Sequence, residues 1–154
     1  MAVFGAAIAA AIISTVVEIV LWACFTDALP GILWRDGRLA AAIVLGPRVL
    51  QPAATFDASV MLVASIVHGA LSIVYALALA MVVRRLPFAQ ALIAGILFGL
   101  ALYAINLHGF TAVFPWFVVA RDGITLTGHL AFGLCASATY WLLRRRFTQD
   151  IAQP

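Results

Sequence analysis

The sequence carries very little charge and no lysine at all. Charged residues make up 10% of its 154 positions, and all nine basic residues are arginines spread along the chain. This leaves no basic face for nucleic acid. A hydrophobic content of 66% and a mean hydropathy of +1.13 lie outside the range of soluble domains. The composition therefore excludes a nucleic-acid-binding protein and predicts an integral membrane protein.

Cysteine is almost absent, and the short motifs of common enzymes are missing. Cys24 lies near the far end of the first apolar run and Cys135 in the middle of the last. Their depths in a membrane differ too much for a disulfide, whose Cα atoms lie within about 7 Å. No nucleophile stands beside a base, and there is neither a glycine-rich phosphate loop nor a CxxC pair. We therefore expect no enzymatic activity.

Long apolar runs are what the sequence has in abundance. Four of them reach the roughly 20 residues that cross a bilayer, and they cover residues 3–25, 58–83, 88–107 and 124–143. They predict an all-α fold, in which residues 1–154 form one up-down-up-down four-helix transmembrane bundle. Within the first long loop, residues 38–50 are apolar but too short to span. We predict a short interfacial amphipathic helix there, broken by Pro47.

The arginines predict the orientation of the helices. Five of them (84, 85, 144, 145 and 146) adjoin run ends on one side, and four (35, 38, 48 and 121) lie in the longer loops on the other side. The positive-inside rule then places both termini in the cytoplasm. The first run lacks a basic leader and is longer than the 7 to 15 apolar residues of a signal peptide, so we expect it to be retained.

Each of the four runs carries a polar residue at a similar depth. Counting about 1.5 Å per residue from the cytoplasmic ends places Glu18, His68, Asn106 and His129 in one layer, roughly 22 to 27 Å up. An ionised carboxylate there costs about 2.5 to 3.5 kcal/mol on insertion scales, so Glu18 must be paired, protonated or next to water. The layer is either a ligand or proton site, or a hydrogen-bonded lock on helix register.

Helical spacing adds neighbours to this layer. The supporting residues share a helix face with it or lie at its outer mouth: Ser65, Ser72, Tyr75, Tyr103, His108 and Tyr140. Gly95 and Gly99 form a GxxxG step, which allows close helix packing. The segments 28–37 and 112–123 resemble each other and both end in Arg-Asp-Gly. We expect these two Arg-Asp pairs to lie on the surface and to fix the ends of the loops.

Several functions fit this pattern. A b-type haem can be held between His68 and His129, because imidazole is its usual axial ligand. Glu18 with the two histidines can instead hold a transition metal such as zinc, copper or iron, or carry protons. Histidine and tyrosine can also bind a quinone or a lipid headgroup, with the aromatic loop as a lid. The leading hypothesis is a non-catalytic accessory subunit that packs against other membrane subunits or against itself.

Parts of the sequence resemble a known group of proteins. The residues are ATFD (54–57), HGALSIVYAL (68–77), FGLALYAINLHGFTAVFPWF (98–117) and HLAFG (129–133). They are similar to small four-helix inner-membrane proteins of proteobacteria, over about residues 39–146. Some of those proteins are labelled sodium:proline symporters, which does not fit a chain without a broken helix. The resemblance implies a multipass protein of the bacterial inner membrane and transfers no site residues.

Overall fold

The chain is all-helical, which confirms the predicted class. The computed structural model describes residues 1–151, with side chains as far as Arg146, and this part contains no strand. Its α-helices are α1 (Ala2–Phe25), α2 (Gly31–Leu45), α3 (Ala58–Val83), α4 (Phe88–Ala104) and α5 (Gly123–Ile151). Shorter segments join them: the 3₁₀ helix η1 (Pro47–Leu50), the π-helix η2 (Ile105–Gly109), and the 3₁₀ helices η3 (Phe110–Ala112) and η4 (Pro115–Ala120).

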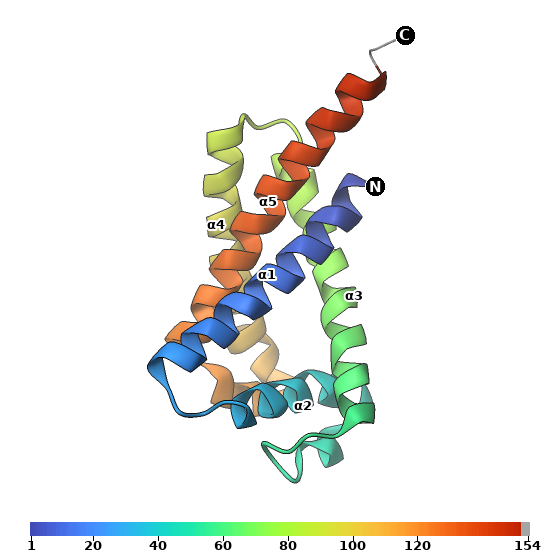
Figure 1. Cartoon of the computed structure of the whole chain (residues 1–154). Helices are drawn as coiled ribbons and strands as arrows, with labels where there is room; N and C mark the ends of the chain where they lie inside the picture. Colours follow the sequence, from blue (N-terminus) through green and yellow to red (C-terminus); the bar gives the residue numbers. More distant parts are fainter. Residues whose placement is uncertain (152–154) are drawn as a thin grey trace.

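The four long helices run between two ends of the molecule (Figure 1). The start of α1, the tight turn between α3 and α4, and the last turns of α5 lie at one end, which we call the turn end. Helix α2 lies across the other end, the α2 end, together with η1 to η4. Helix α5 packs along both α1 and α4, whereas α3 contacts α4 and α5 over only a short stretch.

Local sequence signals set the helix ends. Asp57 accepts hydrogen bonds from the backbone N–H groups of Ser59 (2.9 Å) and Val60 (3.1 Å), which caps the start of α3. Asp122 caps α5 in the same way through the N–H of Thr125 (2.8 Å). Gly46 ends α2 with a φ of 80°, a conformation that favours glycine. These caps explain why the observed helix starts lie close to the predicted ones.

Three predicted boundaries were wrong. The predicted interfacial segment 38–50 is divided. Its residues as far as Leu45 belong to α2, which begins seven residues earlier at Gly31, and its last four form η1 after Gly46. Residues 108–123, expected to form the second long loop, are mostly a series of short helical turns, because α4 passes into the π-helix η2 and then into η3 and η4. Helix α5 continues beyond the predicted end at residue 143 to Ile151, since nothing in the arginine run breaks a helix.

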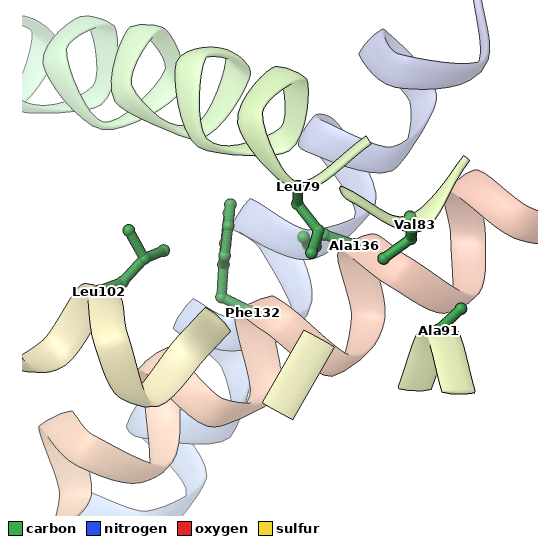
Figure 2. Packing of buried hydrophobic residues seen from close by; sticks show 7 residues of the cluster. Leu79, Val83, Ala91, Leu102, Phe132 and Ala136 are labelled. Carbon is green, nitrogen blue, oxygen red and sulfur yellow. The ribbon is translucent and has the colours of Figure 1, made fainter. Parts of the chain in front are cut away.

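Helices α4 and α5 pack backbone against backbone. A Cβ atom at Gly95 would collide with the Gly133 carbonyl oxygen and with Ser137, and one at Gly99 would collide with the carbonyl oxygen of His129. The GxxxG step predicted for close packing is therefore covered by α5 of the same chain. Next to it lies a hydrophobic cluster from four helices, shown in Figure 2: Ala10, Leu79, Val83, Ala91, Leu102, Phe132 and Ala136.

Three helical segments in residues 1–151 are long and apolar enough to cross a membrane: Ala2–Phe25, Ala58–Val83 and Phe88–Ala112. Their outward faces carry large apolar side chains, which on α1 recur every four residues at Phe4, Ile8, Ile12, Val16 and Val20. Helix α5 does not reach the same apolar content. It lies between α1 and α4, so more of its surface is covered by protein.

Candidate functional site

A cavity of about 300 Å³ lies among the long helices toward the α2 end. Residues from every α-helix and from the short turns that follow α4 line this cavity. The polar lining residues are Ser14, Glu18, Asp36, His68, Ser72, Tyr75, Asn106, Thr125 and His129. The rest of the wall is mainly aliphatic and aromatic. The four polar residues predicted to form one layer all lie on this single cavity.

A chain of polar contacts links α3, η2 and α5 across the cavity. The Tyr75 hydroxyl donates to Asn106 Oδ1 (2.8 Å), and Asn106 Nδ2 lies 3.4 Å from His129 Nε2. His129 Nδ1 lies 2.8 Å from the carbonyl oxygen of Thr125. Because a carbonyl oxygen only accepts hydrogen bonds, Nδ1 carries the proton and Nε2 faces the amide as an acceptor. The contacts therefore assign a neutral imidazole to His129.

Glu18 has a different environment. Its carboxylate rests on α5 at Gly128, where a Cβ atom would overlap it, so glycine makes this approach feasible. Within the described part of the chain, Glu18 has no ion pair, and the charges that act on it are those of Asp36 and Asp122. Both neighbours are acidic. Glu18 is thus a carboxyl group on an apolar cavity, with like charges nearby and no basic partner.

Asp36 brings a second carboxyl group to the cavity from α2. Arg35 Nε lies 2.7 Å from Asp36 Oδ1, and both side chains are largely covered. Burial raises the pKa of Asp36, while the hydrogen bond and charge of Arg35 lower it. The expected surface position was wrong for this pair, because Asp36 lines the cavity.

The second expected Arg-Asp pair does not form. Arg121 donates instead to the Leu107 carbonyl oxygen (2.6 Å) and to the Thr111 hydroxyl (2.7 Å), while Asp122 caps α5. Arg121 thereby ties the start of α5 to the turns after α4. The two similar Arg-Asp-Gly segments do share one feature, since the negative charges of Asp36 and Asp122 both act on Glu18.

His68 and Thr125 complete the polar wall. The His68 imidazole is exposed and lines the cavity. Thr125 is only 7% exposed, and its Oγ1 atom has no hydrogen-bond partner. A buried hydroxyl without a partner is uncommon, because leaving it unpaired costs about 1 to 3 kcal/mol. The polar groups on the wall are therefore not all satisfied by one another.

Aromatic rings cover the apolar part of the wall. Phe110, Phe114 and Phe117 come from η3, η4 and the turn between them, and Phe132 comes from α5. The ring of Phe132 meets that of Tyr75 edge to face, with centroids 6.5 Å apart. Trp116, which lies outside the cavity, donates to the Leu39 carbonyl oxygen (3.1 Å) and so ties this aromatic segment to α2.

The other predicted supporting residues lie elsewhere. Ser65 is exposed and donates to its own helix at the Met61 carbonyl oxygen (2.9 Å). Tyr103 stands behind the cavity wall, its ring 5.7 Å from that of His129 and 5.6 Å from that of the exposed His108. Tyr140 packs against the hydrophobic cluster near the turn end. Only Ser72 and Tyr75 of the supporting set line the cavity.

Sequence reasoning missed the contribution of α2. Asp36, Leu39, Ala40 and Ile43 line the cavity at regular helical spacing. The prediction missed that the helix begins at Gly31. In a helix with this start, Asp36, Leu39 and Ile43 fall on one face. The predicted helix began only at residue 38, which left Asp36 in a loop.

The haem and metal hypotheses find little support in this geometry. Both ring nitrogens of His129 already face protein groups, so a haem iron would have to displace the Asn106 contact. The cavity volume also lies at the lower limit of ligand pockets, which suits a molecule smaller than a macrocycle. Among the residues whose side chains are described, no three His, Cys, Asp or Glu side chains are grouped so that they could hold a metal ion.

Comparison with known proteins leaves the site to be interpreted from its own chemistry. A scan against protein-family models and searches of the curated proteins and of the solved structures give no match.

Proposed function

We propose that this chain is a small multipass membrane protein that binds a small, mainly apolar ligand in the cavity. The observation that carries this proposal is the wall itself, where apolar and aromatic surface surrounds a few convergent polar groups, the usual composition of ligand sites. Glu18, His68 and Thr125 leave hydrogen-bonding capacity for a ligand. The proposed activity is binding, without chemical conversion of the ligand.

The proposed setting is the bacterial inner membrane. We propose that α1, α3, α4 with η2 and η3, and α5 cross it up-down-up-down, while α2 lies at the outer interface. The outward apolar faces of α1, α3 and α4 support contact with lipid. The arginines at the α3–α4 turn and near the end of α5 support cytoplasmic termini, because positive residues favour that side.

A second candidate is a non-catalytic accessory subunit of a membrane assembly, or a self-associating one. The limited contact of α3 with α4 and α5 favours it, since another helix could pack along α3. Gly95 and Gly99 do not support it, because α5 already occupies their surface. A partner would therefore have to use a different face.

Native mass spectrometry of the untagged protein, released from its own membranes in a mild detergent, tests the leading proposal. We expect a bound small molecule above the mass of the 16.4 kDa chain. Leu71 lines the cavity and is 37% exposed, so Leu71→Trp can fill the cavity without disturbing the core. It should abolish the adduct.

Val74→Trp provides the matched control. Val74 lies on the same helix, is 56% exposed and does not line the cavity, so this variant should keep the adduct. A bare chain in all three samples would contradict ligand binding. A larger assembly without a small molecule would favour the accessory subunit instead.

A further inference from the structure

We infer that the ligand of this cavity is a lipophilic organic cation, an amine that carries an aromatic or aliphatic group and is protonated at neutral pH. This inference rests on the proposed ligand-binding function and names its substrate class. It follows from the charges on the wall, the unpaired polar atoms there and the aromatic rings beside them.

The charged groups on the wall are acidic. Glu18 and Asp36 both line the cavity, and Asp122 lies near enough to act on Glu18. No arginine contributes to the lining, and Arg35, which pairs with Asp36, lines a different pocket beside Arg38 and Trp116. His129 is neutral by its hydrogen-bond pattern. The cavity therefore favours a positive ligand and disfavours an anionic one.

The unpaired atoms favour a donor. A carboxyl group taken out of water without a partner is costly, and a ligand that brings positive charge removes that cost. Glu18 has no such partner in the described chain, and the buried Thr125 Oγ1 on the same wall lacks one as well. A protonated amine supplies both a positive charge and an N–H donor from which these oxygens can accept a hydrogen bond.

The aromatic rings suit the same ligand. Phe110, Phe114, Phe117 and Phe132, together with Tyr75, surround the cavity. Aromatic faces attract cations, and more strongly where water is excluded. A neutral carbonyl compound such as a quinone would accept hydrogen bonds from the wall, where the Tyr75 hydroxyl already donates to Asn106, and it would leave Glu18 without a positive partner. The observations therefore favour the cation over the neutral acceptor.

The test compares two probes of similar size by isothermal titration calorimetry in a mild detergent at neutral pH. Benzyldimethylamine is cationic, and N,N-dimethylbenzamide is neutral with a carbonyl acceptor. We expect the intact chain to bind the amine about tenfold or more tightly than the amide. Glu18→Gln, which keeps the shape and removes the charge, should abolish this preference.

Asp27→Asn is the matched control, because Asp27 is exposed, follows α1 and does not line the cavity. It should keep the full preference for the amine. The melting temperature of Glu18→Gln should not fall, since the change removes a carboxylate without a partner. A lower affinity of that variant for the amine therefore reports recognition and not unfolding.

Three outcomes would overturn the inference: equal or tighter binding of the amide, no binding of the amine, or an amine affinity that Glu18→Gln leaves unchanged. None of them bears on whether the cavity is occupied in native membranes. That question is answered by the adduct and its loss in Leu71→Trp, so failure of the cation and failure of the ligand site are distinguishable.

Discussion

The turn end and the α2 end are built from the same long helices but pack differently. Toward the turn end, small residues bring backbones together, as at Gly95 against Gly133 and Ser137, and the cluster around Leu79 and Val83 leaves no polar gap. Toward the α2 end, bulky rings and polar side chains separate α3 from α4 and α5, and the space between them is the cavity.

The difference shows how one fold can combine close helix packing with a cavity. Close packing of small residues is the main source of helix association in lipid, where burial of apolar surface contributes little. At the α2 end, hydrogen bonds such as those of Arg38 and Trp116 add to the packing of α2 on α3 through Ala41 and Ala64. Each mode of packing can be broken separately, which the following variants do.

The largest effect is expected at the turn end. In Gly95→Val, the new side chain meets the Gly133 carbonyl oxygen and Ser137, neither of which can move away without separating α4 from α5. We expect a loss of about 3 kcal/mol or more in the free energy of unfolding, measured by denaturant titration in detergent. Gly69→Val is the control, since no atom lies near its Cβ position. Equal stability of the two variants would contradict the backbone contact.

Arg38→Ala should weaken the α2 end alone. Arg38 is 4% exposed and donates to the carbonyl oxygens of Val49 (2.7 Å) and Thr55 (2.9 Å) and to the Thr55 hydroxyl (3.0 Å). Without Arg38 these acceptors lose a charged donor. We expect the free energy of unfolding to fall by about 1.5 to 3 kcal/mol.

Limited proteolysis checks this expectation. The segment 46–57 should be cleaved faster in Arg38→Ala than in the exposed control Arg48→Ala. Cleavage that stays as slow as in the intact chain would show that the segment is held by other contacts.

Tyr75→Phe should have a smaller effect, because it removes one hydrogen bond across the cavity and keeps the ring. Such bonds between membrane helices contribute about 0.6 kcal/mol on average. The matched control is Tyr140→Phe, a tyrosine of the hydrophobic cluster with no hydrogen bond of its hydroxyl in the described structure. Unfolding in detergent should separate the two variants by this amount. A larger loss in Tyr140→Phe would reverse the comparison.

The smallest effect is expected at the cap of α3, and it depends on pH. Hydrogen bonds from the Ser59 hydroxyl and from the N–H groups of Val60 and Ser59 hold the pKa of Asp57 below its usual range. The ionised carboxylate therefore adds stability above the unfolded pKa of about 3.9, and this contribution is lost as pH falls through the lower folded value. The melting temperature of Asp57→Asn should lie below that of the intact chain at neutral pH.

The two melting temperatures should then converge as the solution is acidified past the folded pKa of Asp57. Asp27→Asn, at an exposed carboxylate that caps no helix, should show no such convergence. A difference between Asp57→Asn and the intact chain that persists unchanged in acid would mean that the ionised cap is not its cause.

Sequence reasoning predicted the helices well because their signals are local. The stretch 58–83 was predicted as a helix and is one, since Asp57 caps its start and the arginine pair with Pro87 ends it. Depth counting also placed Glu18, His68, Asn106 and His129 at one level, and all four line the cavity. The predicted rotation of α3 about its axis was inexact, because Ser65 faces outward although it was expected beside His68.

Whether a polar side chain meets a partner depends on contacts far apart in the chain. The pairing of Tyr75 with Asn106 spans 31 positions, and the tie from Trp116 to Leu39 spans 77. The position of Asp36 on the cavity follows from α2 lying across the helix ends, which its own sequence does not indicate. That Glu18 has acidic neighbours and no basic partner likewise becomes known only from the tertiary structure.

The sequence alone was enough to predict where the four long helices begin and how apolar they are, because both properties depend on residues within one or two turns. The contact of α4 with α5 at glycines, and the smaller contact of α3 with these two helices, depend on the tertiary structure. Close approach depends on the shapes of two surfaces at once, and a polar cavity forms where no pair of surfaces fits. The cavity is therefore a property of how the helices meet, and no single helix encodes it.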